Sequence, residues 1–168
     1  GTPLMIAVMV VSLFILFGNW LTAAGGTHFF TDIAMAMMGR YRGGAAKVSV
    51  AGSMLFGSIS GSAVANVMAT GVVTVPTMIR SGFPRVMAGA VEAVASTGGQ
   101  LAPPIMGAAA FLMAEFMQVS YGTIILAAII PAVFYYFSLF VAVDLTAARE
   151  GVEGLDASTL PRKRDVLA

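Results

Sequence analysis

Cysteine is absent from this chain of 168 residues, which excludes disulfide bonds, thiolate catalysis and cysteine-bound metals. Charge is also scarce, because Lys, Arg, Asp and Glu together make up only 10% of the residues, whereas 58% are apolar. A soluble domain could not bury so much apolar surface, so the composition indicates an integral membrane protein. With a formal net charge of +1 and no basic cluster, we expect no nucleic-acid partner.

The motifs of common enzyme active sites are missing as well. The run Gly57-Ser58-Ile59-Ser60-Gly61 is not a nucleophile elbow, since Ile59 stands where the serine must be. The glycine pair at 98–99 lacks the Lys-Ser/Thr that follows in a phosphate-binding loop. The single histidine, His28, lies far along the chain from these serines. We therefore expect no enzyme activity, no organic cofactor and no transition-metal site.

Long uncharged stretches predict membrane-spanning helices. Residues 3–23 carry no charge, and about 20 helical residues cross a hydrocarbon core of about 30 Å. This stretch lacks the basic flank and cleavage site of a secretory signal. Residues 121–145 predict a second full span, kinked at Pro131. Residues 27–38 predict an interfacial helix, capped by Thr27, that lies along the membrane surface. Its apolar face is formed by Phe29, Phe30, Ile33 and Met37.

Two polar interruptions divide the other apolar runs. The first is the Ser/Gly-rich stretch 58–62. It lies within residues 47–80, where no ionisable side chain occurs between Lys47 and Arg80. Because each half is short, we predict a re-entrant helical hairpin that reaches the membrane midplane and returns. The second interruption, 96–104, contains two glycines and two prolines. It splits residues 84–118 into a discontinuous transmembrane helix.

The distribution of positive charge predicts the orientation. Arg40, Arg42 and Lys47 precede the hairpin, and Arg80 and Arg85 follow it, so by the positive-inside rule both ends of the hairpin are cytoplasmic. No Lys or Arg occurs in residues 86–148. We therefore predict an all-α membrane unit over residues 1–148, with a periplasmic N-terminus and a cytoplasmic tail over residues 149–168.

The interruptions have a predictable chemistry. Backbone carbonyls freed inside a membrane, together with Ser, Thr and Asn oxygens, suit a hard cation such as Na⁺, whereas the N-termini of half-helices attract anions. Such discontinuous segments are typical of transporter sites. The alternative is that small residues only let helices pack closely, as in a non-transporting scaffold or assembly subunit. A passive channel is disfavoured, since no ring of like charges is present.

Isolated polar residues have weaker interpretations. Glu92 is a carboxylate within an apolar helix, four residues before Ser96. It either sets charge or relays protons near the cation site, or it is structural and bonded to hairpin amides. We expect Asp144 to be a solvated helix end and Glu115 to be interfacial. The methionines are most simply packing residues.

Three runs give the chain a family resemblance: GSISGSAVANVMATG, VPTMIRSGFP and AGAVEAVASTGGQLAPPIMGAAAFLMAEF. They closely resemble the large permease subunit of tripartite ATP-independent periplasmic (TRAP) transporters and look most like the TAXI-type fused permeases. The resemblance covers nearly the whole chain. It implies a Na⁺-coupled, elevator-type importer of organic anions, chiefly carboxylates, in a bacterial or archaeal inner membrane, fed by a periplasmic binding protein.

In this family two inverted repeats each contain one hairpin and one broken helix. The resemblance implies that this chain supplies one repeat, as a fragment or split gene product. Its partners would be the other repeat, a small membrane subunit or fused domain, and the lipid bilayer. The implied Na⁺ ligands are Ser60, Gly61, Ser62, Ala63, Asn66, Thr97, Gly98, Gly99 and Pro103. The implied substrate-binding residues are Ser62, Asn66 and Gln100, and Glu92 would tune the charge of the site.

Overall fold

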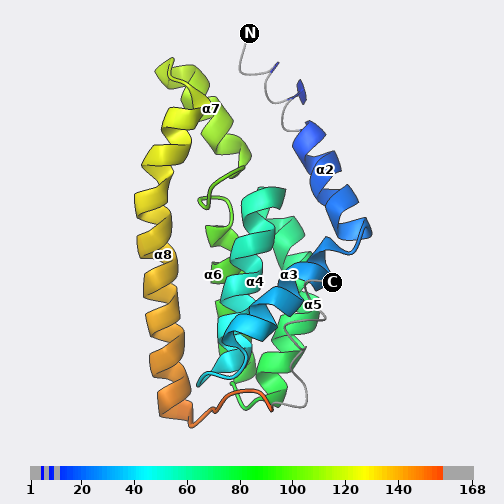
Figure 1. Cartoon of the computed structure of the whole chain (residues 1–168), viewed down its shortest axis with the longest axis vertical. Coiled ribbons are helices and arrows are strands. Elements are labelled where there is room, and N and C mark those ends of the chain that lie inside the picture. Colours follow the sequence, from blue (N-terminus) through cyan, green and yellow to red (C-terminus); the bar gives the residue numbers. More distant parts are fainter. Residues whose placement is uncertain (1–4, 6–7, 10–11, 157–168) are drawn as a thin grey trace.

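A computed structural model describes residues 5, 8–9 and 12–156, and the regular elements in this part of the chain are all helical. The expected all-α class is therefore confirmed. In Figure 1 the long helix α8 runs along one side, α4, α5 and α6 pack together in the middle, and α2 lies on the other side. The helices are α2 (Ser12–Ala23), α3 (Gly26–Met38), α4 (Gly44–Ser60), α5 (Ala63–Arg80), α6 (Arg85–Gly98), α7 (Ala108–Met117) and α8 (Tyr121–Glu150).

Many polar side chains face the interior and many large apolar ones face outward, although the core also holds apolar residues such as Phe56 and Met78. On α5, Asn66, Thr70 and Thr74 are buried at one-turn spacing, whereas Met68 and Val72 are 70% and 71% exposed. A helix of a soluble protein shows the reverse arrangement, with its apolar stripe against the core. This inverted polarity is what an apolar solvent around the protein requires, because there the polar groups must find their partners inside.

Helix α3 follows the same rule and corrects one expectation. Thr27 does not cap it, because the helix already begins at Gly26 and the Thr27 hydroxyl is buried without a hydrogen-bond partner in the described residues. Thr31 is buried too, whereas Phe29 and Met37 are 49% and 57% exposed. Of the apolar face expected for this helix, Phe29 and Met37 therefore point away from the bundle, whereas the Phe30 ring packs edge-to-face on the buried Phe56 of α4.

The break between α4 and α5 is shorter than the sequence pattern suggests. Helix α4 continues through Ser60, and only Gly61 and Ser62 are non-helical. Gly61 ends α4 in a left-handed conformation, with φ of +62° and its amide bonded to the Gly57 carbonyl, a conformation that favours glycine. Ser62 then caps α5 by accepting a hydrogen bond from the Ala65 amide. Local capping chemistry thus accounts for the whole turn.

The second interruption is longer. Helix α6 ends at Gly98, and α7 begins only at Ala108. The connecting loop, residues 99–107, contains Pro103 and Pro104, which have no backbone amide for an α-helical bond. The loop is closed on itself by a hydrogen bond of 2.9 Å from the Gly107 amide to the Gln100 carbonyl.

Two of the described helices, α5 and α8, are long and apolar enough to cross a membrane. Helix α8 includes the predicted span 121–145 and stays helical through Pro131 up to Glu150. The predicted span 3–23 lies partly outside the described residues, and α2 forms its second half. Tyr135 and Tyr136 tie α8 to α6 by donating to the carbonyls of residues 94 and 95 at 2.7 and 3.2 Å.

In Figure 1 the start of α4, the end of α5 and the end of α8 lie at the same end of the molecule. Here the loop before α4 bonds to the segment after α8, because the Gly43 amide donates to the Val152 carbonyl and the Leu155 amide to the Gly39 carbonyl. The basic residues expected on the cytoplasmic side flank these segments.

Helices α4 and α6 meet backbone to backbone where Gly57 and Gly99 face each other. A Cβ atom built on Gly57 would lie 2.7 Å from the Cα of Gly99, and one built on Gly99 would lie 2.6 Å from the Cα of Gly57. Side chains at these positions would force the two segments apart. Glycine is required here for close approach, not for a special dihedral angle.

We predict that Gly99→Ala destabilises the protein by about 1–3 kcal/mol, the usual effect of overpacking, because the added methyl meets backbone that cannot rotate away. Gly89→Ala on α6 is the matched control, since a Cβ there has no neighbour within 4 Å. It should leave stability unchanged or raise it by up to about 1 kcal/mol through helix propensity. Thermal unfolding of the purified protein in detergent measures both, and equal melting temperatures for the two variants would contradict the close approach.

Candidate functional site

The structure brings the two interrupted segments into direct contact. The carbonyl of Ser58, near the end of α4, accepts hydrogen bonds from the amides of Ile105 and Met106 at 3.1 and 3.3 Å. A Cβ on Gly61 would collide with the Met106 carbonyl oxygen, so the hairpin tip and the loop 99–107 are in van der Waals contact. The two breaks form one continuous irregular region.

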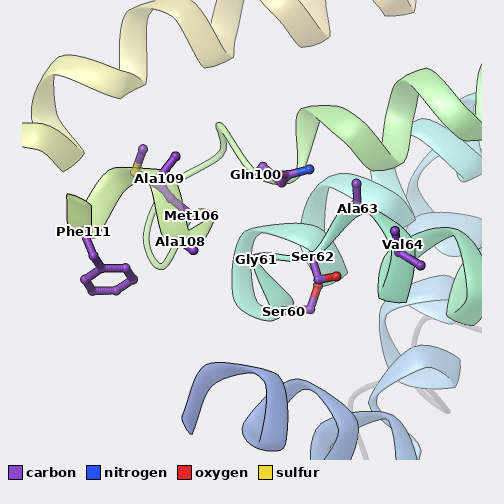
Figure 2. Close-up of a pocket in the computed structure, with 10 residues that line it drawn as sticks. All are labelled: Ser60, Gly61, Ser62, Ala63, Val64, Gln100, Met106, Ala108, Ala109 and Phe111. Carbon is purple, nitrogen blue, oxygen red and sulfur yellow. The ribbon is translucent and has the colours of Figure 1, made fainter. Parts of the chain in front are cut away.

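A cavity of about 320 Å³ opens between the hairpin tip and the start of α7. Figure 2 shows Ser60 and Ser62 close together at the tip, with Met106 and Ala108 across the gap and Gln100 between the two walls. The lining residues come from both interruptions and from the helix turns beside them. They are Ser60, Gly61, Ser62, Ala63, Val64, Gln100, Met106, Ala108, Ala109 and Phe111.

Helix ends of both polarities reach this cavity. Residues 63–64 and 108–109 in its wall are the first residues of α5 and α7, so two helix N-termini with partial positive charge border the space. Ser60 is the last residue of α4, whose C-terminus has partial negative charge. The arrangement can bind an anionic group and a cation near each other.

Ser60 lines the cavity, and its hydroxyl, like that of Thr27, is a buried polar group without a hydrogen-bond partner among the described residues. Ser60 is only 4% exposed. A buried hydroxyl without a partner costs about 1–3 kcal/mol, so such groups are rare unless a ligand completes them. By contrast, the Oγ of Ser62 already accepts a bond from the Ala65 amide at 3.2 Å.

The remaining expected site residues lie outside the cavity wall. Thr97 is exposed, and its hydroxyl donates to the Ala93 carbonyl of its own helix at 2.8 Å. Gly98 packs against the ring of Tyr135 on α8. Pro103 lines a separate hollow beside α8. The expected Na⁺ ligands are thus not all adjacent in this conformation.

Asn66 is fully buried between α4 and α6. Its Nδ2 donates to the carbonyls of Ser53 and Ser96 at 2.8 and 3.4 Å, and a Cβ built on Gly57 would lie 2.5 Å from this nitrogen. Asn66 therefore supports the Gly57–Gly99 contact from the inside of the bundle. It does not line the cavity, in contrast to Ser62 and Gln100.

A second polar cluster, which sequence reasoning missed apart from Glu92, lies between α4, α5 and α6. The Glu92 carboxylate is 1% exposed and is surrounded by hydroxyl groups rather than by amides. Its hydrogen-bond donors are Ser49, Ser53, Thr70, Thr74 and Ser96. A signal was present in the sequence, because these residues fall in pairs at i and i+4 on otherwise apolar helices.

Asp144 also differs from the expectation of a solvated helix end. Its carboxylate pairs with Arg42, and it accepts a hydrogen bond of 2.6 Å from Lys47 on α4. The side chain is 33% exposed, so the pair adds little stability by itself. It does link α8 to the start of the hairpin.

Comparison with known proteins identifies the family of the chain. The model of the family described as the tripartite ATP-independent periplasmic transporter, DctM component, matches residues 5–168. The chain belongs to this family. That it resembles the TAXI type more than other TRAP permeases stays a prediction.

Several curated relatives are named as TRAP permeases. The C4-dicarboxylate TRAP transporter large permease protein DctM of Pseudomonas aeruginosa is 31% identical over 139 residues, which cover 83% of this chain and 32% of that protein. The protein of the same name from Vibrio cholerae is 31% identical over 139 residues, covering 83% and 30%. The isethionate TRAP transporter permease protein DctMQ of Oleidesulfovibrio alaskensis is 33% identical over 97 residues, covering 58% and 15%.

The chain therefore spans between 15% and 32% of the length of these relatives. All three are named as transporter permeases and none as an enzyme, in agreement with the expectation for this chain. Within the part of the TRAP chain that the structure describes, no three His, Asp or Glu side chains gather where they could hold a metal ion.

We predict that Asn66→Asp destabilises the TRAP permease by about 3 kcal/mol or more, because a buried carboxylate would then face two carbonyl oxygens without a compensating charge. Gln118→Glu is the control, since Gln118 lies exposed in the turn between α7 and α8. Denaturation midpoints of the purified permease measure the difference. Similar midpoints for both variants would show that the Asn66 amide does not hold α4 and α6 together.

Proposed function

We propose that this chain is one repeat of a Na⁺-coupled TRAP permease that imports organic anions delivered by a periplasmic binding protein. The observation that carries the proposal is the cavity between the hairpin tip and α7, with the buried, unpartnered Ser60 hydroxyl in its wall. The family membership supports a transporter, and the cavity supplies a place where a small ion and an anionic group can bind together.

The cation would bind on the α4 side of the cavity. Hard cations such as Na⁺ favour hydroxyl and carbonyl oxygens, and the end of α4 offers both: the Ser60 hydroxyl, and carbonyls no longer bonded within the helix. The partial negative charge of the helix C-terminus adds to the attraction. The expected ligands outside the cavity wall would have to approach in another conformation or act indirectly; they are Asn66, Thr97, Gly98, Gly99 and Pro103.

The anionic group of the substrate would bind near the first turns of α5 and α7. Ser62 and Gln100 line this part of the cavity and can hydrogen-bond a carboxylate. The relatives named for C4-dicarboxylates and for isethionate suggest a substrate with a terminal carboxylate or sulfonate group. Two helix N-termini favour either group without selecting between them.

The exposed apolar faces of α3, α5 and α8 support placement in a lipid bilayer, the inner membrane in the case of a TRAP permease. We propose that the end of the molecule with Arg42 and Lys47 faces the cytoplasm, so that α4 and α5 form a re-entrant hairpin whose tip lies inside the membrane. A second repeat and a small membrane subunit or fused domain would complete the transporter, which would work by an elevator movement.

The scaffold alternative is favoured by one specific observation, the backbone contact of Gly57 with Gly99. These two glycines serve helix packing. A scaffold has no use, however, for a cavity at the hairpin tip with a buried hydroxyl that lacks a partner. The glycines that pack and the serine that lines the cavity thus have separate roles in one hairpin.

We predict that Ser60→Ala raises the Na⁺ concentration for half-maximal uptake about tenfold, equivalent to about 1.4 kcal/mol, through the loss of one oxygen ligand. Ser58→Ala is the matched control, because the Ser58 hydroxyl is bonded to the Leu55 carbonyl of its own helix at 2.9 Å. The measurement is uptake of a labelled C4-dicarboxylate by the complete permease in proteoliposomes with its binding protein. The same Na⁺ dependence in both variants would contradict the assignment of Ser60, and uptake independent of Na⁺ in the unmodified permease would contradict Na⁺ coupling itself.

A further inference from the structure

Glu92 is a buried ionisable group that neither lines the cavity at the hairpin tip nor lies at a helix end. It lies within α6 and is 1% exposed. Hydroxyl groups from three helices approach its two carboxylate oxygens. The Oε1 atom accepts hydrogen bonds from Thr70 at 2.5 Å, Ser96 at 3.1 Å and Ser53 at 3.3 Å. The Oε2 atom accepts hydrogen bonds from Ser49 at 2.7 Å and from Thr74.

No positive charge in the described residues faces this carboxylate from the helices packed against α6. The charged side chain of α4, Lys47, is bonded to Asp144 of α8. On α5 the charged residue is Arg80, exposed in the last turn, and on α6 Arg85 is exposed at the first position.

From α8, Tyr135 and Tyr136 approach α6 but donate to the carbonyls of residues 94 and 95. The remaining charged residues of α8, Arg149 and Glu150, are exposed at its end. Neutral hydroxyl groups alone therefore stabilise the ionised form of Glu92.

The same hydroxyl groups can also accommodate the protonated form. The Thr70 Oγ1 is 2.9 Å from the Asn66 carbonyl oxygen, and the Thr74 Oγ1 is 3.0 Å from the Thr70 carbonyl oxygen. When a proton binds Glu92, the carboxyl can donate to one threonine oxygen while that threonine donates to the carbonyl of its own helix. Every donor keeps an acceptor in both states, so neither form leaves an unsatisfied buried group.

We propose that Glu92 is a proton-binding site of the permease, and that the hydroxyl groups around it change donors and acceptors when the proton binds or leaves. The proposal deepens the proposed transport function and rests on it. The reaction transfers one proton from a hydronium ion to one carboxylate oxygen: an O–H bond of the hydronium ion breaks, the carboxyl O–H bond forms, and water is released.

The site is connected to the two interruptions through Asn66. The Thr70 hydroxyl approaches both the carbonyl and the Oδ1 of Asn66, and the Nδ2 of Asn66 contacts the carbonyls of Ser53 and Ser96. Asn66 in turn abuts Gly57, where α4 meets Gly99. A change of hydrogen bonding at Glu92 therefore reaches the contact between hairpin and broken helix through two residues, Thr70 and Asn66.

A proton fits this site better than a metal cation does. The hydroxyl oxygens already lie at hydrogen-bond distance from the carboxylate, whereas a cation bound between them would become their common ligand and hold them apart. The same oxygen types would suit Na⁺ in an expanded cluster, so the experiment must distinguish these two occupants.

Infrared difference spectroscopy of the purified complete permease, titrated from about pH 5 to about pH 9, tests the proposal without a transport assay. We expect a protonated carboxyl band that appears as the pH falls and that is missing from Glu92→Gln. A spectrum unchanged by Glu92→Gln throughout this range would overturn the proposal. A Glu92 signal that responds to Na⁺ at constant pH, and not to pH, would overturn it in favour of a cation site.

Thr74→Val provides a second test that does not require Glu92 to be replaced. It removes one hydroxyl partner of the carboxyl group, so the band of the protonated form should change in frequency, because that frequency depends on the hydrogen bonds of the carboxyl. Thr77→Val is the matched control, because the Thr77 hydroxyl bonds to the Val73 carbonyl, at 2.6 Å. The same carboxyl band frequency in the two valine variants would contradict the proposal, whether or not Glu92→Gln folds.

Discussion

The structure depends on one constraint: polar groups that cannot reach water must find partners within the protein. The chain leaves the helical conformation at two places within strongly apolar sequence. The backbone groups freed there meet, with the Ser58 carbonyl accepting two amides from the loop 99–107. This mutual satisfaction explains why the two interruptions lie side by side. It also requires glycine at residues 57 and 99, since larger residues would separate the segments that need each other.

The same constraint gives the interior its chemistry. Side chains with hydroxyl, amide and carboxylate groups are enclosed by α4, α5 and α6, and large apolar side chains such as Met68 point outward. Two polar regions result. One is the cavity at the hairpin tip, and the other is the hydroxyl cluster around Glu92, midway along α6. Asn66 bonds to the carbonyls of Ser53 on α4 and Ser96 on α6, the helices that carry both polar regions. This contact is the physical basis for treating the cavity and the Glu92 cluster as parts of one mechanism.

Membership of the DctM family and the geometry of the hairpin tip support the same function by different routes. The family places the chain among TRAP permeases, whereas the geometry locates where an ion and an anionic group would bind. Because the chain covers at most 32% of the length of the relatives compared, the transport function belongs to the whole permease. The alternative of a packing role is correct for Gly57 and Gly99, and it leaves the Ser60 hydroxyl unexplained.

Composition and local pattern determined much of this protein in advance. The apolar runs, the glycines and the prolines predicted helices and their interruptions, because helix capping and chain breaking depend on a few neighbouring residues. The TRAP resemblance likewise came from contiguous runs. The sequence also marked Ser60 to Ser62 and Gln100 as neighbours of a common site, and these residues do line one cavity.

Tertiary structure alone decided which polar residues gather. Thr97 turns back to its own helix and Pro103 faces α8, although both belong to the same interruption as Gln100. The Glu92 cluster draws on three helices, so no local pattern could assign its donors. Which face of a helix meets which neighbour depends on the way that the helices cross, and the crossing is set by contacts between residues far apart in the chain, such as Gly57 and Gly99.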